Sequence, residues 1–255
     1  MLKAPKIDGD PVPMPNFLRL VFLLLFCCAA LAIAQVQNSS SSKSSEDRSA
    51  KQQRNTEAAK KAEVEGEDYL FQKHDINRAI DSFKKSVKLD PWYEHGYIML
   101  GLAYMQTEHW DQAQWAFEDA AKVDPDDPQA WLGVGSALNE QKDYVGAQKA
   151  IQHSLELKPD SAEAHYELAR SLWGMNRLEP AEEHARRATE LNKDYASPHV
   201  LMGNIYLSEV NADSALAEFR ESLRLEPEGP QAETVKATIA KIEKAMADAA
   251  PKKKQ

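Results

Sequence analysis

Residues 94–127 read EHGYIMLGLAYMQTEHWDQAQWAFEDAAKVDPDD, and this stretch decides the fold. Its first half spaces apolar and small residues three or four positions apart, at Tyr97, Leu100, Gly101 and Tyr104. The second half repeats that spacing at Ala113, Phe117 and Ala120. Side chains three or four residues apart share one face of an α-helix. The stretch therefore predicts two amphipathic helices, the second of which stops before Pro125 because proline cannot continue a helix.

The same pattern recurs with a period of 34 residues. Prolines follow it at Pro91, Pro125, Pro159 and Pro227, with Lys193 at the missing position. One alanine position is filled five times, by Ala79, Ala113, Ala147, Ala181 and Ala215. We predict five helix-turn-helix repeats, at residues 60–93, 94–127, 128–161, 162–195 and 196–229.

These residues closely resemble the tetratricopeptide-repeat (TPR) family, whose 34-residue pattern also places a small residue at position 8, Ala at 20 and Pro at 32. The resemblance implies an all-α fold, a right-handed superhelical solenoid of helix-turn-helix repeats. Residues 230–249 follow as a single amphipathic stretch with Val235, Ile239, Ile242 and Met246 on one side, and we predict a C-terminal capping helix there. The first repeat departs from the pattern at Glu63, Gly66 and Glu67, so its first helix is expected to be a frayed outer end.

The N-terminus predicts export. The apolar run Leu20–Ala34 is shorter than the roughly 20 residues that a membrane-spanning helix needs. Ala32 and Ala34 supply the small residues that a signal peptidase requires before Gln35. We interpret residues 1–34 as a signal peptide, with an uncleaved inner-membrane anchor as the alternative, and Met14 as a possible alternative start. The expected location is periplasmic or secreted.

The remaining flanks are polar. Residues 35–59 begin with a serine-rich run that has no apolar period, and we predict a flexible linker. Residues 250–255 form a basic tail. The formal net charge of −9 is therefore concentrated in the repeats, which argues against a nucleic-acid partner.

No residue constellation for catalysis is visible. The only cysteines, Cys27 and Cys28, lie in the apolar run, so the mature protein is expected to have neither a disulfide nor a thiol nucleophile. Nucleotide-binding loops and hydrolase and metalloprotease motifs are absent from the sequence. We predict a protein that is not an enzyme, with no metal, no cofactor and no small-molecule substrate.

In the TPR family, side chains at positions 2, 5, 9, 12 and 13 of each first helix line an inner groove that holds partner peptides. The resemblance assigns to this groove Ile98, Leu102, Met105, Leu132, Tyr166, Arg170, Trp173, Val200, Asn204 and Leu207. For Val64, Ile98, Leu132 and Val200, packing against neighbouring helices is an equally good explanation. The carboxylate clamp of chaperone-binding members is missing, since Leu102, Leu132 and Ser136 occupy its positions.

The preferred contacts are Tyr166 and Trp173, with Arg170 between them to pair a carboxylate or carbonyl of the partner. The function expected is a non-catalytic scaffold or adaptor of the cell envelope that binds an apolar or amphipathic segment of a protein or peptide. The alternative is a constitutive structural subunit of a membrane-tethered assembly. Membrane contact is expected only through an uncleaved N-terminus, and a soluble form beginning at Gln35 favours the first reading.

Overall fold

The structure, a computed structural model, describes residues 49–249, and the chain divides into two units, Met1–Asn55 and Thr56–Gln255. The predicted signal peptide with Ala32, Ala34 and Gln35, most of the predicted linker, and the basic tail lie outside the described residues. In the first unit the described residues 49–55 are helical. None of the helices described between residues 49 and 249 combines the length and hydropathy that crossing a bilayer requires.

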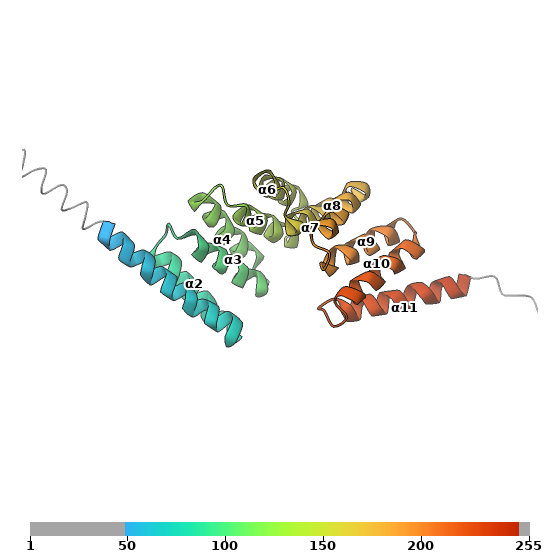
Figure 1. The fold of residues 1–255 in the computed structure, drawn as a ribbon, viewed down its shortest axis with the longest axis horizontal. Coiled ribbons are helices and arrows are strands. Elements are labelled where there is room, and N and C mark those ends of the chain that lie inside the picture. Colours follow the sequence, from blue (N-terminus) through green and yellow to red (C-terminus); the bar gives the residue numbers. More distant parts are fainter. Residues whose placement is uncertain (1–48, 250–255) are drawn as a thin grey trace, which may run out of the picture. The chain divides into compact units, whose positions relative to one another are not determined.

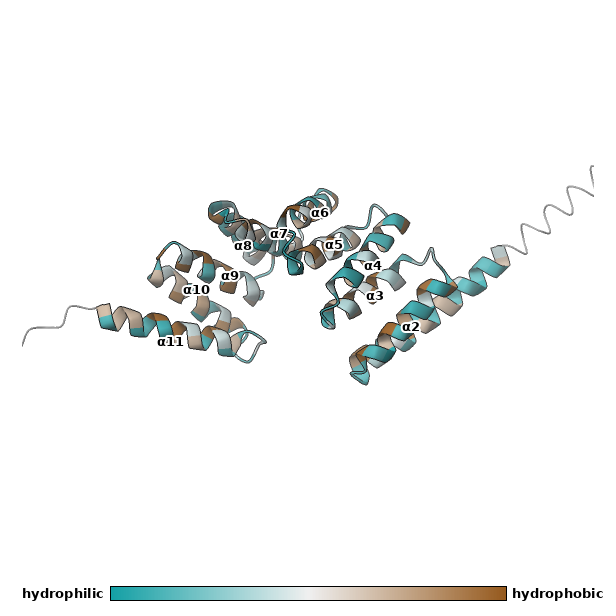
Figure 2. Cartoon of the chain, turned by 180° about the vertical axis from the view of Figure 1, so that it is seen from behind, coloured by the Kyte–Doolittle hydropathy of each residue, from teal (hydrophilic) through white to brown (hydrophobic). Residues whose placement is uncertain are grey.

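The second unit is an array of paired helices, and its described part contains no strand. Residues 56–67 are helical and lead into a π-helical turn, η1 (Asp68–Gln72) (Figure 1). The helices that follow are α2 (Ile76–Leu89), α3 (Glu94–Gln106), α4 (Trp110–Val123), α5 (Pro128–Glu140), α6 (Tyr144–Leu157), α7 (Ala162–Gly174), α8 (Leu178–Leu191), α9 (Ala196–Ser208), α10 (Ala212–Leu225) and α11 (Ala232–Ala249). This all-α array is the architecture that the sequence predicted. Apolar and polar segments alternate along each helix (Figure 2), as expected where only one face is buried.

One backbone conformation recurs in the turn that joins the two helices of each pair. The described non-glycine residues with positive φ are His74, Glu108, Lys142, Asn176 and Val210, and their φ angles lie between 52° and 64°. They are spaced 34 residues apart. A left-handed residue just after a helix lets the backbone N–H groups of the turn bond to the last carbonyls of that helix. In the α5–α6 turn, for example, the Asp143 N–H donates to the Leu138 carbonyl at 2.9 Å.

The two helices of a pair approach closely because a small residue faces a large one. Gly101 lies against Phe117, Gly135 against Ile151 and Gly203 against Phe219. The α7–α8 pair uses a different solution, with Ala169 and Ala185 at the corresponding positions, both fully buried. The side-chain volume at this position of the second helix thus determines whether the facing position of the first helix is glycine or alanine.

The first repeat follows the same rule with its register shifted. A Cβ added at Gly66 would lie 2.5 Å from Cε1 of Phe83, so Gly66 is the glycine that faces the large residue. Along the sequence, Gly66 lies one residue farther from Phe83 than Gly101 lies from Phe117. The wider π-helical turn Asp68–Gln72 accommodates this extra residue. The expectation of a frayed first helix is therefore wrong, because the apparent mismatch at Gly66 and Glu67 is a one-residue insertion.

The predicted linker is also wrong at its C-terminal end, since residues 49–59 are helical. The serine run ends there, and the residues that follow are mainly Ala, Lys, Gln and Glu, which are strong helix formers. Ala59 and Ala62 are buried. Buried Glu63 accepts hydrogen bonds from Tyr93 and His95 at the beginning of α3, which fixes this helix to α3.

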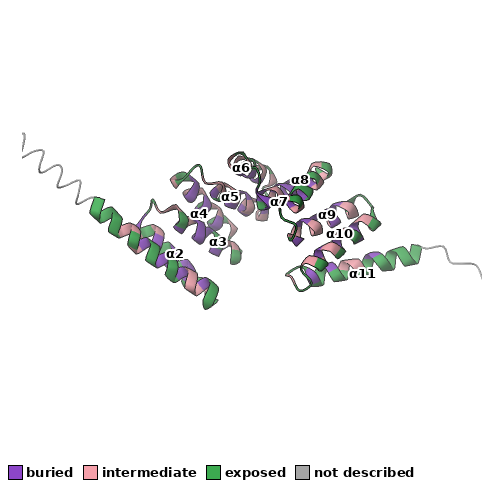
Figure 3. Cartoon of the chain, viewed as in Figure 1, coloured by how far each residue is buried: buried purple, intermediate pink, exposed green. Residues whose placement is uncertain are grey.

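The C-terminal helix α11 covers the last pair. Val235 and Ile242 are buried against Phe219 and Leu216 of α10. Beyond Ile242 the helix is exposed, as Figure 3 shows by the change from purple to green. The predicted capping helix is present, but only its residues up to Ile242 carry out the capping, since Met246, predicted on the same side, is 39% exposed.

Candidate peptide-binding groove

The candidate site lies on the first helices of successive pairs. Helices α3, α5, α7 and α9 contact one another in that order, because each pair stacks on the next. We call the surface formed by these four first helices the groove. Two cavities open on it. One lies over α3, α5 and α7 and the other over α7 and α9.

The first, which we call the apolar cavity, has a volume of about 610 Å³. Its apolar wall is formed by Ile98, Leu102, Met105 and Leu132. Leu102 is 44% exposed. The opposite wall is polar, with Glu163 and Glu167 from α7 and Lys158 from the end of α6. A cavity of this size and composition suits apolar side chains.

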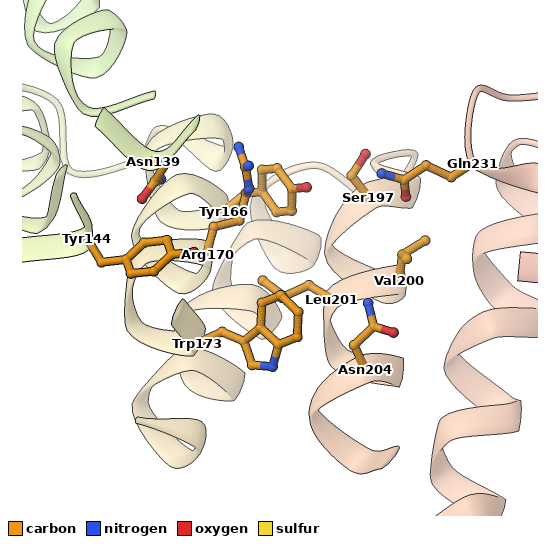
Figure 4. Close-up of a pocket in the computed structure, with 10 residues that line it drawn as sticks. All are labelled: Asn139, Tyr144, Tyr166, Arg170, Trp173, Ser197, Val200, Leu201, Asn204 and Gln231. Atoms are coloured by element: carbon orange, nitrogen blue, oxygen red, sulfur yellow. The ribbon is translucent and has the colours of Figure 1, made fainter. Parts of the chain in front are cut away.

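The second, which we call the aromatic cavity, has a volume of about 200 Å³. In Figure 4, Tyr166 and Trp173 face the helix that carries Ser197, Val200 and Asn204. Tyr144 closes one side and Gln231 the other. Trp173 is 40% exposed, whereas Tyr166 packs edge-on against Tyr195 with ring centroids 5.2 Å apart. Of the two aromatic residues, Trp173 therefore offers more surface to a partner.

Arg170 is already neutralised within the protein. Its Nη2 donates to Glu140 Oε1 at 2.6 Å, and its Nη1 donates to Glu167 Oε2 at 3.0 Å. The guanidinium also lies 6.0 Å from the ring centroid of Tyr166. Burial alone would lower the pKa of Arg170, but the carboxylates of Glu167 and Glu140 outweigh it and raise that pKa. The expectation that Arg170 pairs a carboxylate of the partner is therefore not supported by its surroundings.

A buried amide holds this network in place. Asn139, which is 3% exposed, donates from Nδ2 to the Glu167 carboxylate at 2.8 Å and to the Glu167 carbonyl at 2.9 Å. Its Oδ1 accepts from Ser171 Oγ at 2.8 Å. Asn139 thus joins α5 to α7 and presents Glu167 to Arg170. Buried networks in which every group is paired rigidify their surroundings.

The predicted groove residues fall into three sets. The apolar cavity unites Ile98, Leu102, Met105 and Leu132, and the aromatic cavity unites Tyr166, Arg170, Trp173, Val200 and Asn204. Ile98 is only 5% exposed and belongs to the core, so packing is its main role. Leu207 lines neither cavity and packs with the C-terminal cluster beneath α11.

Three carboxylates of the groove were not among the predicted residues. Glu163 occupies position 2 of its repeat and Glu140 occupies position 13, both of which the family pattern assigns to the groove. The family's groove positions, taken together, therefore predict both Glu163 and Glu140. Glu167 occupies position 6, which is not a groove position of the family, but its i, i+3 spacing from Arg170 on α7 is a signal from which this pair could have been found.

The fourth repeat also carries a histidine pair, with one ring from α7 and one from α8. Nδ1 of His165 and Nδ1 of His184 are 3.0 Å apart, with ring centroids at 5.2 Å. His165 Nε2 lies 3.1 Å from the Pro159 carbonyl, so this nitrogen carries the proton and donates it in a hydrogen bond. Nδ1 of His165 then accepts a hydrogen bond from the Nδ1–H group of His184. Burial lowers the pKa of both imidazoles. Within residues 49–249, no group of three His, Cys, Asp or Glu side chains is arranged to hold a metal ion.

Comparison with known families agrees with this architecture. Residues 98–162 and residues 138–205 each match a family model described as tetratricopeptide repeat. The chain is a TPR protein. Proteins of this kind serve generally as scaffolds for protein–protein interaction and are typically non-catalytic. No curated protein sequence matches the chain.

Several solved structures share the TPR fold. TTC0263, a TPR protein of Thermus thermophilus, superposes with a TM-score of 0.62 at 15% identity, covering 73% of this chain and 99% of its own. PilF of Pseudomonas aeruginosa gives 0.62 at 19% identity, covering 77% and 89%. YrrB, described as a TPR protein with an unusual peptide-binding site, gives 0.50 at 21% identity, covering 67% and 88%. At these identities the likeness concerns the fold alone.

Proposed function

We propose that this TPR protein is a non-catalytic scaffold of the cell envelope that holds an apolar or amphipathic segment of a partner protein in its groove. The apolar cavity carries the proposal, because about 610 Å³ lined by Leu102, Met105 and Leu132 is left open on the surface. Exposed apolar surface of this kind marks interaction sites in soluble proteins. The peptide-binding site described for YrrB, which has the same fold, supports a polypeptide as the class of partner.

Site-specific photocrosslinking tests the proposal. A photoreactive amino acid at Leu102 should crosslink to a polypeptide in an envelope extract, because this side chain opens into the apolar cavity. The same probe at Val145, which is 56% exposed on α6 and lines neither cavity, is the matched control. Equal crosslinking from both positions, or none from Leu102, would contradict a groove-bound partner.

We further propose that the chain contains five repeats. The recurrence of a left-handed residue from His74 to Val210 at 34-residue spacing supports that count, as does the compensating π-turn that brings Gly66 against Phe83. Deleting residues 128–161, one full period, should leave a cooperatively folding chain, because each repeat contacts only its neighbours. Loss of cooperative unfolding in this variant would contradict the repeat boundaries.

The envelope location rests on the N-terminal sequence. Leu20–Ala34 and the residues Ala32 and Ala34 before Gln35 support cleavage and export. Sequencing the N-terminus of the mature protein tests this directly. A mature chain that retains Leu20–Ala34 would favour the anchored alternative.

A further inference from the structure

The apolar wall of the groove runs along a helix axis. Ile98, Leu102 and Met105 follow one another at intervals of four and three residues on α3, so they form one stripe over two turns. The stripe is about 10 Å long at 1.5 Å per residue. Ile98 lies at its base, and Leu102 and Met105 face the apolar cavity together with Leu132 of the next first helix.

A partner helix matches this stripe better than an extended strand does. An amphipathic helix presents apolar side chains at i, i+4 and i+7, the same intervals that α3 uses. An extended strand sends alternate side chains to opposite sides, and those on one side are about 7 Å apart. The apolar cavity is one continuous space of about 610 Å³, which is wide enough for several adjacent apolar side chains.

The charges around the cavity favour a basic partner. Among the charged residues that line the apolar cavity, the carboxylates of Glu163 and Glu167 outnumber the ammonium of Lys158. Arg170 is bound by Glu140 and Glu167, so it has no charge left to offer an acidic segment. Within the described part of the chain, Glu163 receives only the Ser161 hydroxyl, at 3.3 Å, and no cation within ion-pair distance. The net charge of −9 adds a long-range field that attracts cations.

We propose that the occupant of the apolar cavity is a basic amphipathic helix of a partner protein. Its apolar side chains pack on Leu102, Met105 and Leu132, and a lysine or arginine on its polar side pairs with Glu163. This inference rests on the proposed function and specifies which segment the groove accepts.

Three fluorescently labelled synthetic peptides of equal length test it. The first has leucine at i, i+4 and i+7 and lysine on its polar face. The second replaces each lysine by glutamate, and the third keeps the first composition but alternates leucine and lysine as a strand does. Binding to the full chain is measured by fluorescence anisotropy at low and high salt. The protein variants are Leu102→Asp, Glu163→Gln and, as a matched control, Val145→Asp.

The lysine helix should bind at least about tenfold more tightly than the glutamate helix at low salt, and this ratio should shrink as salt screens the charges. Glu163→Gln should weaken the lysine helix by roughly two- to fivefold, the range of an exposed ion pair. Leu102→Asp should weaken it more than about tenfold, because a carboxylate would then enter the apolar cavity. Val145→Asp should change nothing.

Each contrary result has a separate meaning. Equal or tighter binding of the glutamate helix overturns the basic partner, and equal binding of the alternating peptide overturns the helical one. In both cases the proposed function stands. If no peptide binds a chain whose helix content is intact while Leu102 still crosslinks to a polypeptide, this inference alone fails. If the crosslink is also absent, the proposed function fails with it.

Discussion

Gly203→Ala should destabilise the protein, although replacing glycine inside a helix normally stabilises it. An added Cβ at residue 203 would lie 2.6 Å from Cε1 of Phe219 and 2.8 Å from its Cδ1 and Cζ. Carbon atoms pack at about 3.5–4.0 Å, so the ring would have to retreat by about 1 Å. Phe219 is 1% exposed and surrounded by the C-terminal cluster, which leaves it no free space.

The magnitude follows from two opposing effects. Overpacking a buried site costs about 1–3 kcal/mol. Alanine in place of glycine in a helix interior returns about 1 kcal/mol. We therefore expect Gly203→Ala to lower the free energy of unfolding by about 1 kcal/mol.

A double-mutant cycle isolates the contact. In the Phe219→Ala background the ring is gone, so Gly203→Ala should stabilise by about 1 kcal/mol. The resulting coupling energy is about 2 kcal/mol, within the range for residues in contact. The double variant reproduces the pair that α7 and α8 already use, Ala169 and Ala185. Ala169→Gly is the reciprocal control, since it creates no clash and should cost only about 1 kcal/mol of helix propensity.

Urea unfolding followed by far-UV circular dichroism measures all of these variants under one buffer. The slope of the transition must be the same for each, so that midpoints report stability. A stabilising Gly203→Ala in the wild-type background would refute the close-approach explanation. An effect of equal size in both backgrounds would refute it as well.

Three further predictions concern the turns, the histidine pair and the cap. Val210 is a β-branched residue with φ 60° and is 90% exposed. The Val210→Gly substitution should therefore raise the free energy of unfolding by about 1 kcal/mol, measured by urea unfolding. Asn176→Gly at the equivalent turn should be nearly neutral, because asparagine tolerates this conformation. Burial lowers the pKa of His165 and His184 below 6.5, so the unfolded chain binds more protons than the folded one below that pH. The free energy of unfolding should therefore fall between pH 7.5 and 5.5, and it should fall by less in the His184→Gln variant. An identical loss in both proteins would show that the pair does not titrate with folding. Val235 on α11 is 2% exposed, so the Val235→Asp substitution should lower the free energy of unfolding by about 2–4 kcal/mol. An unaltered melting curve would mean that the cap is not docked.

The groove was only partly predictable from the sequence. The family pattern found the apolar wall and the aromatic pair, because position within a repeat fixes the direction of a side chain. It also placed Leu207 in the groove, whereas the structure packs Leu207 with the C-terminal cluster, and it did not reveal that Ile98, at the base of the apolar wall, is buried in the core. The direction in which a side chain points does not reveal whether a neighbouring helix already covers it.

The sequence by itself determined the helix pairs, their stacking and the cap. A 34-residue period repeated several times overdetermines these features, since each helix face is specified by local spacing and each repeat confirms the others. Only the tertiary structure decided that Arg170 is neutralised, because Glu140 belongs to the preceding first helix and reaches Arg170 only when the two repeats stack. It also decided the register of the first helix, because the one-residue shift of Gly66 resembles a loss of the pattern in the sequence and is explained only by the π-turn and the approach of Gly66 to Phe83. Local periodicity determines which face of a helix is buried, and contacts between repeats determine which charges and surfaces remain free for a partner.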